Sequence, residues 1–284
     1  MDLPLRSVLF APGNDRRKID KALGLGASLV MLDLEDAVAA AEKEAARSAV
    51  CEVLAATPAG PAIGVRINAL ASGLADADLD ALAPQLPRIA LITIPMADGP
   101  DEVRHVAARL DELERAAGGA PTGLLVMAET ARGILAARAI AEASPRVRTL
   151  LFGPADLGRE LGVEPTADGF EQLHARSALV LAARAAGKEA PVDGPYLKLD
   201  DDDGCVVSAG WSRRLGFQGK VALHPRQLPI VTAAFAPGER ELAWARDVDR
   251  AFREAEASGT SSLKLADGTF VDYAVAARAR DLLR

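Results

Sequence analysis

The stretch TGLLVMAETARGI, residues 122–134, contains a complete transition from strand to helix. Leu124 to Ala128 is an uninterrupted apolar run of strand length, and a helix-like pattern begins near Arg132. Glu129 directly follows the apolar run, with no loop before it. A buried carboxylate is costly unless it is paired, neutralised or bound to a metal. We therefore expect Glu129 either to lie at a solvated strand end or to be held there for a chemical purpose.

Similar apolar runs, followed by helix-like residues, recur on both sides of this stretch. They are RSVLFAPG, SLVMLDLED, AIGVRIN and RIALITIP before it, and VRTLLFGPAD, EAPVDGPY and GKVALHP after it. Uninterrupted runs are typical of parallel strands that are covered on both faces. Eight strand–helix units over about 235 residues predict an α/β fold, a closed (β/α)8 TIM barrel. A doubly wound open sheet is the alternative, but no glycine-rich dinucleotide motif follows the first strand.

The pattern changes after Pro237. Residues 239–257 predict a long charged helix, Asp267-Gly268 predicts a hairpin turn, and YAVAARARDLL, residues 273–283, predicts a last helix. We therefore expect a barrel domain over residues 1–237 and a C-terminal extension over residues 238–284. The extension acts either as a packing appendage or as a lid.

Composition narrows the possible partners. The net charge of −7 argues against nucleic acid as the main partner, because a phosphate backbone requires a basic face. Two cysteines, far apart in the sequence, predict neither a disulfide framework nor a zinc site. The sequence MDLPLRSVLF lacks the features of a signal peptide, and no stretch is long and apolar enough to span a membrane. These features predict a cytoplasmic protein with no membrane partner.

The carboxyl ends of the predicted strands carry most of the charged residues that could act in chemistry. In such barrels the active site lies at these ends. Glu129 and Asp156 follow successive strands, and Mg²⁺ typically takes one or two carboxylates and several other oxygens. Both are therefore candidate metal ligands. Arg66, at the end of the third strand, could clamp a substrate carboxylate or a developing enolate oxygen.

Each of these residues also has a structural interpretation. Glu129 could compensate the dipole of the following helix, and Asp156 could cap a short helix over residues 157–161. Arg66 could form an ion pair with Asp33 or Glu35. The acidic cluster at the end of the second strand comprises Asp33, Glu35 and Asp36. We expect one or two of its members to orient Arg66 or a bound water, and the rest to cap the next helix.

Six motifs occur in an order and spacing that resemble a known family. They are RSVLFAPGN, MLDLEDAVAAAEKEAAR, VRIN, AETARG, FGPADLG and LGFQGKVALHPRQ. They are similar to the citrate lyase β-subunit-like group of the HpcH/HpaI aldolase superfamily, from about Arg6 to Pro237. The resemblance implies a barrel enzyme that cleaves or forms a C–C bond in β-hydroxyacyl thioesters with Mg²⁺ as cofactor.

The resemblance also implies roles for individual residues. Glu129 and Asp156 would hold the metal, and the candidate catalytic residues are Arg66, Asp33, Glu35 and Asp272. Asp272 matches a tail carboxylate that closes over a neighbouring subunit's site as proton donor, which implies a homotrimer or a dimer of trimers. Candidate substrate-binding residues are Arg66, Gly153, Pro154, Ala155, and, for the coenzyme A or carrier arm, Pro12, Asn14, Arg17 and Lys18.

These assignments predict cleavage of citramalyl-coenzyme A, malyl-coenzyme A or a similar thioester to acetyl-coenzyme A and an oxoacid. One alternative is the citryl-lyase subunit of a multi-enzyme complex, which acts on an acyl-carrier protein. A lid with Asp272 favours the free thioester. Another alternative is a barrel that binds a thioester without cleaving it, because Met96 stands where the group usually has Lys.

Overall fold

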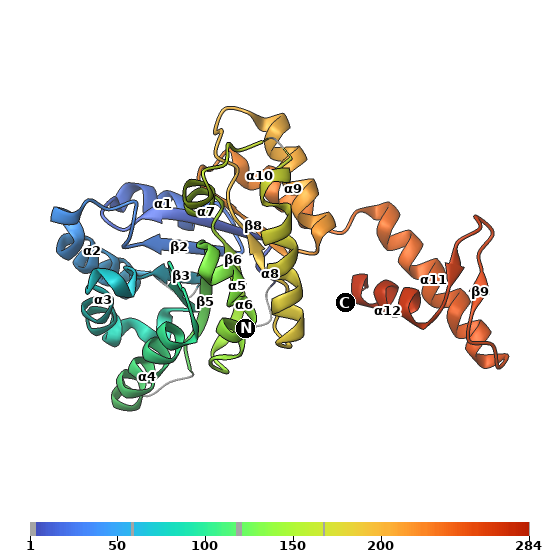
Figure 1. The fold of residues 1–284 in the computed structure, drawn as a ribbon, viewed down its shortest axis with the longest axis horizontal. Helices are drawn as coiled ribbons and strands as arrows, with labels where there is room; N and C mark the ends of the chain where they lie inside the picture. Colours follow the sequence, from blue (N-terminus) through green and yellow to red (C-terminus); the bar gives the residue numbers. More distant parts are fainter. Residues whose placement is uncertain (1–3, 58–59, 118–120, 167, 284) are drawn as a thin grey trace. The chain divides into compact units, whose positions relative to one another are not determined.

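The computed structural model describes residues 4–57, 60–117, 121–166 and 168–283 (Figure 1). Residues 1 and 284, the outer limits of the two predicted domains, lie outside the described residues. The chain divides into two compact units, one ending at Phe235 and the other beginning at Ala236. The predicted division lies after residue 237, two residues later. The two units are described separately.

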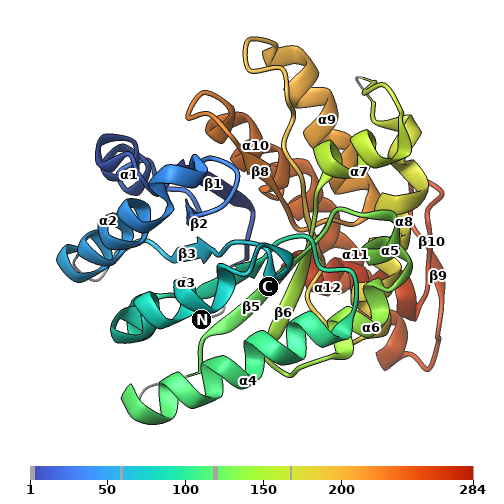
Figure 2. The same cartoon turned by 60° about the vertical axis from the view of Figure 1, so that its left-hand side comes forward.

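Parallel strands of the first unit close into a barrel, as predicted. In the described residues each strand from β1 to β8 pairs with the next, and β8 pairs with β1. Figure 2 shows helices arranged around these strands. The strands are β1 (Ser7–Pro12), β2 (Leu29–Asp33), β3 (Ile63–Arg66), β4 (Leu91–Ile94), β5 (Gly123–Ala128), β6 (Val147–Phe152), β7 (Val192–Asp193) and β8 (Gly219–Ala222).

Both faces of the barrel wall are buried. One cluster fills the barrel interior and includes Val8, Met31, Leu125, Leu151 and Val221. Residues next to them in sequence, such as Val30, Val126 and Phe152, belong to a larger cluster between strands and helices. Burial on both faces explains why the strands read as continuous apolar runs.

Helices follow the strands, as the helix-like residues after each apolar run predict. The helix after β6 begins at Pro154, earlier than the predicted 157, because proline suits the first helical position. The helices are α1 (Arg16–Leu23), α2 (Lys43–Ala56), α3 (Ala75–Leu82), α4 (Pro100–Ala117), α5 (Ala131–Leu135), α6 (Ala137–Glu142), α7 (Pro154–Leu161), α8 (Leu173–Ala185), α9 (Asp202–Leu215) and α10 (Gln227–Phe235). Short 3-10 turns are η1 (Ala40–Glu42), η2 (Leu70–Ser72), η3 (Ala83–Arg88) and η4 (Phe170–Gln172).

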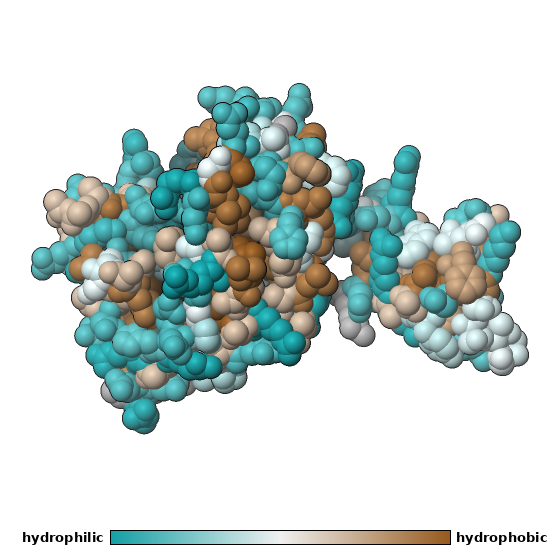
Figure 3. All heavy atoms as spheres, in the orientation of Figure 1, coloured by the Kyte–Doolittle hydropathy of each residue, from teal (hydrophilic) through white to brown (hydrophobic). Residues whose placement is uncertain are grey.

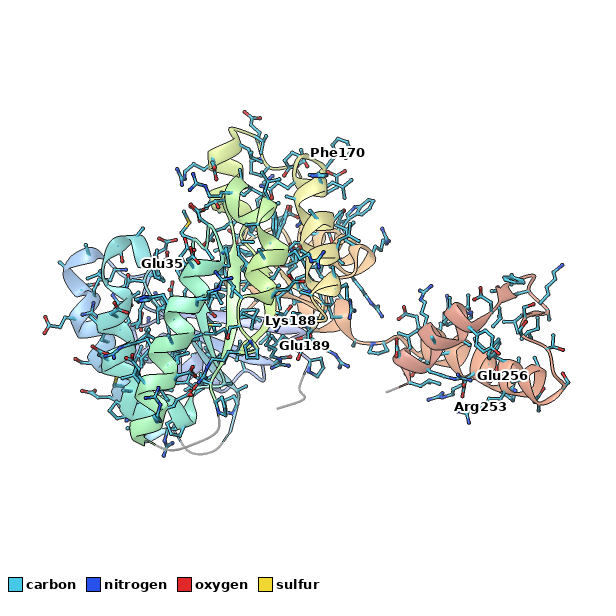
Figure 4. The ribbon with its side chains drawn as sticks, turned by 60° about the horizontal axis from the view of Figure 1, so that its bottom comes forward. Glu35, Phe170, Lys188, Glu189, Arg253 and Glu256 are labelled. Atoms are coloured by element: carbon cyan, nitrogen blue, oxygen red, sulfur yellow. The ribbon has the colours of Figure 1, made fainter. Side chains whose placement is uncertain are left out.

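The second unit contains the predicted helix, hairpin and helix. These are α11 (Glu239–Ala257), β9 (Leu263–Lys264) paired antiparallel with β10 (Phe270–Val271), and α12 (Tyr273–Leu282). Its small core includes Val248 and Phe252, and Phe252 meets Tyr273 edge to face at 5.1 Å. Arg253 and Glu256, labelled in Figure 4, lie on α11, where Arg253 pairs with Asp249.

In the part of the chain that the structure describes, every helix is too short or too polar to cross a membrane.

Candidate active site

Glu129 directly follows β5, and its carboxylate is held in place from two sides. The residue is only 3% exposed. Its Oε1 accepts a hydrogen bond of 2.7 Å from the backbone N–H of Met96. Met96 has a φ of 51°, which is uncommon for a residue other than glycine. On the other side lies Gly153, where a Cβ atom would be 2.2 Å from the Cβ of Glu129. Only glycine at position 153 leaves space for this carboxylate.

The environment of Glu129 disfavours a negative charge. Burial raises the pKa of Glu129 to about 7, and the nearby carboxylates of Asp156 and Asp36 add to the rise. The Met96 N–H and the Arg66 guanidinium act in the opposite direction. A bound cation would favour the charged form of Glu129 in this place.

Arg66 is held by two carboxylates at the end of β2. Its Nε and Nη2 donate to Asp33 at 2.7 and 2.6 Å, a bidentate pair. Its Nη1 lies 2.7 Å from Oε2 of Glu35, and its guanidinium carbon lies 5.2 Å from the ring centre of Phe10. The ion pair expected as an alternative is therefore present with both Asp33 and Glu35. Whether Arg66 also contacts substrate remains a prediction.

Glu35, labelled in Figure 4, is the second carboxylate with a strongly raised pKa. Burial raises its pKa to about 8, against the effect of Arg66 and with a further contribution from Asp36. Although Oε2 is close to Arg66, it has no aligned hydrogen bond. Nη1 of Arg66 therefore contacts Oε2 without an aligned hydrogen bond, and the raised pKa makes Glu35 an easily protonated group beside Arg66.

The acidic cluster does not cap the following helix, contrary to our expectation for part of it. The carboxylate of Asp33 accepts from the N–H groups of Glu35 and Ala37 and so fixes the turn after β2. Asp36 lies 3.9 Å from Arg66, and the residue at the N-cap position of α2 is Glu42. The expectation was wrong because η1 lies between this turn and α2.

Asp156 lies in the first turn of α7, not at its N-cap as the structural alternative required. Gly153 is at the N-cap, and Pro154 and Ala155 follow it. The Asp156 side chain is about one-third exposed and lies 3.6 Å from Arg159. An acid in the first turn also suits the helix dipole. The carboxylate of Asp156 remains accessible to a ligand.

A cavity of about 160 Å³ brings many of the predicted residues together. Those that line it are Arg66, Glu129, Gly153, Pro154, Ala155 and Asp156. Most of its apolar walls are not predicted from the sequence; these include Phe10, Met127, Leu151 and Val221. A signal for them did exist, because they are inward-facing residues near the carboxyl ends of their strands.

The remaining predicted residues lie elsewhere. Pro12 ends β1, and Asn14 donates to Glu42 at 2.5 Å. Arg17 and Lys18 are exposed on α1, where Lys18 pairs with Asp15. Asp272 belongs to the second unit, and it caps α12 by accepting from the N–H groups of Ala274 and Val275. A role in binding or catalysis for these residues stays a prediction.

Glu129 and Asp156 fit a magnesium ion. Among the described residues no group of three or more His, Cys, Asp or Glu side chains is arranged to hold a metal. Mg²⁺ does not need such a group, because it usually takes one or two carboxylates and keeps several waters. The donors are hard oxygens, they border a cavity, and the pKa of Glu129 is raised in a way that a cation would reverse.

Comparison with known proteins identifies the family. Residues 6–225 match the family model described as HpcH/HpaI aldolase/citrate lyase. The chain belongs to this family. The resemblance drawn from the six motifs is therefore confirmed, and the match covers all eight strands of the barrel.

Several similar proteins match this chain over most of their own length. A (3S)-malyl-CoA thioesterase of Cereibacter sphaeroides is 36% identical over 99% of this chain and 94% of its own. The human mitochondrial citramalyl-CoA lyase is 29% identical over 98% of this chain and 84% of its own. The structure of CitE from Mycobacterium tuberculosis, in complex with magnesium, acetoacetate and coenzyme A, has a TM-score of 0.79 and 34% identity. It covers 98% of this chain and 96% of its own.

Proposed function

We propose that this protein is a Mg²⁺-dependent carbon–carbon lyase. Its substrate is a β-hydroxyacyl-coenzyme A thioester such as citramalyl- or malyl-coenzyme A. The products are acetyl-coenzyme A and an oxoacid. Relatives named citramalyl-CoA lyase and citrate lyase subunit beta, and a neighbour with magnesium and coenzyme A, support this reaction class.

One observation carries the proposal. Two carboxylates from neighbouring strand ends, Glu129 and Asp156, border one cavity together with the guanidinium of Arg66. The two carboxylates can hold a cation, and Arg66 provides a fixed positive charge at the same cavity. Cleavage next to a hydroxyl group requires both, because negative charge develops on substrate oxygens as the C–C bond breaks.

The residues of this chain divide the work as follows. Mg²⁺, when bound by Glu129 and Asp156, lowers the pKa of a substrate hydroxyl. Arg66, oriented by Asp33 and Glu35, stabilises negative charge on a substrate oxygen. The first turn of α7 offers the backbone N–H groups of Ala155 and Asp156 to substrate oxygens, whereas Pro154 has no N–H.

We assign the proton donor to the tail. Asp272 of a neighbouring copy would protonate the enolate carbon of the departing acyl thioester. This assignment rests on the family resemblance and requires an oligomer. The hydrogen bonds of Asp272 in α12 fix the direction of its side chain, which suits a residue presented by a lid.

Hydrolysis of the thioester is the second candidate reaction. The relative named (3S)-malyl-CoA thioesterase favours it, at 36% identity. A hydrolase would release free coenzyme A and a hydroxyacid, whereas a lyase releases acetyl-coenzyme A and an oxoacid. The products therefore distinguish the two reactions.

We infer that the barrel assembles with further copies of itself through an apolar face on α5, α7 and α8. A groove of about 550 Å³ lies there, and Figure 3 shows brown, hydrophobic side chains gathered along it. Leu135 is 87% exposed and Leu181 is 71% exposed, which is unusual for a lone soluble domain. In the proposed trimer, a second copy of the chain would cover this groove.

Sedimentation tests this assembly. Leu181→Glu should shift the protein toward the monomer, because it places a charge in an apolar contact. Val206→Glu on α9 is the matched control, since Val206 is also exposed but lies outside the groove. A wild-type protein that sediments as a monomer at working concentration would refute the assembly.

The metal assignment is tested by Glu129→Gln and Asp156→Asn, with Mg²⁺ binding measured by calorimetry and activity measured in parallel. Each variant should lose at least tenfold in Mg²⁺ affinity, together with metal-dependent activity. Glu142→Gln is the control, because the exposed side chain of Glu142 lies at the end of α6 and away from the cavity lining. If either site variant binds Mg²⁺ like the wild type, the assignment is wrong.

A further inference from the structure

A second charged cluster lies outside the barrel interior, between the strands and their helices. It contains Arg176 of α8, Asp193 of β7 and Lys220 of β8, which are 5%, 0% and 0% exposed. Oδ2 of Asp193 accepts from Nη2 of Arg176 at 2.9 Å and from Nζ of Lys220 at 2.8 Å. The hydroxyl of Ser212 on α9 donates to the same oxygen.

The charges of this cluster do not balance. Two cations share one carboxylate, and no other carboxylate among the described residues forms an ion pair with Arg176 or Lys220. A buried charge without a partner costs several kcal/mol in a protein interior. Burial lowers the pKa of Lys220, so loss of its proton is one way to relieve the cost. Binding of an anion is the other.

Two nitrogens of the Arg176 guanidinium have no acceptor among the described residues. Nε is buried without a hydrogen-bond partner, and Nη1 also lacks an acceptor there. Next to Nη1 is Gly169, with a φ of 67°, where a Cβ atom would lie 2.4 Å from that nitrogen. Any larger residue at position 169 would fill the space beside the guanidinium.

Arg176, and Gly169 beside its Nη1, border a cavity of about 80 Å³. Its polar lining includes Gln172, Tyr196, Lys198 and Ser208 as well as Arg176. Glu171 also borders it, but Oε2 of Glu171 already accepts from the hydroxyl of Thr166. The lining residues Pro154, Pro195 and Leu197 are shared with the candidate active-site cavity. The two cavities are therefore adjacent.

We propose that this second cavity binds a small oxyanion, a carboxylate or phosphate group, against Nη1 of Arg176. This nitrogen can donate a charge-assisted hydrogen bond to such a group. Lys198, an exposed cation at the same cavity, adds attraction. The bound anion balances the buried charge of Arg176, Asp193 and Lys220. The site is independent of the proposed lyase reaction, and the anion is either a group of the thioester or a separate ion.

A carboxylate built into the cavity should replace the ligand. Ser208→Asp supplies one, and Ser208→Asn is its neutral counterpart of the same shape. Without multivalent anions, the melting temperature of Ser208→Asp should exceed that of Ser208→Asn by about 2–4 °C, the shift typical for a modest gain in a protein of this size. Inorganic phosphate, added at ionic strength matched with sodium chloride, should raise the melting temperature of the wild type and of Ser208→Asn but much less that of Ser208→Asp.

The comparison among variants removes the general stabilising effect of phosphate, which acts on all of them alike. Lys198→Ala should weaken the response to phosphate, whereas Lys264→Ala, on the hairpin of the second unit, should not. Acetate in place of phosphate tests the carboxylate. If phosphate and acetate shift the melting temperatures of wild type and Ser208→Asp equally, the cavity is no anion site and the proposal is wrong.

Coenzyme A identifies the source of the anion. Its affinity for Ser208→Asp and for Arg176→Gln, measured by calorimetry, is compared with that for the wild type. Weaker binding to both assigns the site to a phosphate of coenzyme A, and unchanged binding assigns it to a separate ion. Both assignments require that Ser208→Asp has first lost the response of its melting temperature to phosphate. Neither binding measurement depends on lyase activity.

Discussion

Gly153 and Met96 together fix the carboxylate of Glu129. The missing side chain at position 153 makes room for it, and the Met96 N–H orients one of its oxygens. Met96 therefore acts here through its backbone N–H, which a lysine at this position would also provide. The family resemblance implies that Met96 stands in place of such a lysine. The change would then remove a cation but keep the support of Glu129.

Gly153→Ala should displace Glu129, because the new Cβ would lie 2.2 Å from the Cβ of Glu129. We expect a loss of about 1–3 kcal/mol in stability and at least tenfold in Mg²⁺ affinity. Gly210→Ala in α9 is the control, since a Cβ there meets no atom within 4 Å. Chemical denaturation and metal titration measure both effects. Wild-type metal affinity in Gly153→Ala would contradict the close packing.

The raised pKa values of Glu129 and Glu35 predict a pH dependence for the metal-free protein. Burial raises both pKa values from 4.5, to about 7 and about 8. Between pH 4.5 and the raised pKa values, the folded state therefore binds more protons than the unfolded state. The stability of the folded state then falls as the pH rises from about 5 through 8. Mg²⁺ should oppose the fall, because it binds the deprotonated form of Glu129.

Thermal unfolding between pH 5 and pH 8.5, in chelator and in Mg²⁺, measures this dependence. Glu129→Gln keeps an oxygen for the Met96 N–H but cannot ionise, so its stability in chelator should decline less steeply with pH. A metal-free wild type that becomes more stable from pH 6 to pH 8 would show that these two carboxylates do not dominate.

At the scale of elements, the sequence predicted strands better than contacts. Continuous apolar runs identified all eight strands, because burial on both faces leaves that pattern. β7 was the weakest and has only Val192 and Asp193 in the ladder, since Pro191 cannot donate to it. Helix starts were less certain, as α7 shows.

Contacts across the barrel could not be predicted, because they depend on register and on rotamers. The sequence left open whether Arg66 pairs with Asp33 or Glu35, and it pairs with both. Gly153 was expected at the site only from the family resemblance, while its fit against Glu129 required coordinates. The buried cluster around Asp193 was missed, since Arg176 and Lys220 lie far apart in sequence and neither forms a motif.

Asp272 allows its structural and chemical roles to be separated within α12. Asparagine caps a helix about as well as aspartate, so Asp272→Asn should keep the stability of the protein, whereas Asp272→Ala should cost about 1 kcal/mol. Asparagine cannot donate a proton as an acid. If Asp272 is the proton donor, kcat of Asp272→Asn should fall by about 10²–10⁴. Full activity in Asp272→Asn would leave Asp272 with the capping role alone.

At the scale of the whole molecule, closure of the barrel explains why distant residues share one cavity. Parallel strands place all their carboxyl ends on one rim, so Arg66 of β3, Glu129 after β5 and Asp156 of α7 meet there. The same arrangement places the second cavity beside the first, through the loops after β6 and β7. The candidate active site and the proposed anion site therefore lie at the same end of the barrel.

The most direct measurement identifies the products from citramalyl-coenzyme A and malyl-coenzyme A, with Mg²⁺ and with chelator. Our account predicts acetyl-coenzyme A together with pyruvate or glyoxylate, and no product in chelator. Release of free coenzyme A and the intact hydroxyacid would instead show a thioesterase. Absence of any product from either thioester in Mg²⁺ would contradict a lyase that acts on free coenzyme A thioesters of this class.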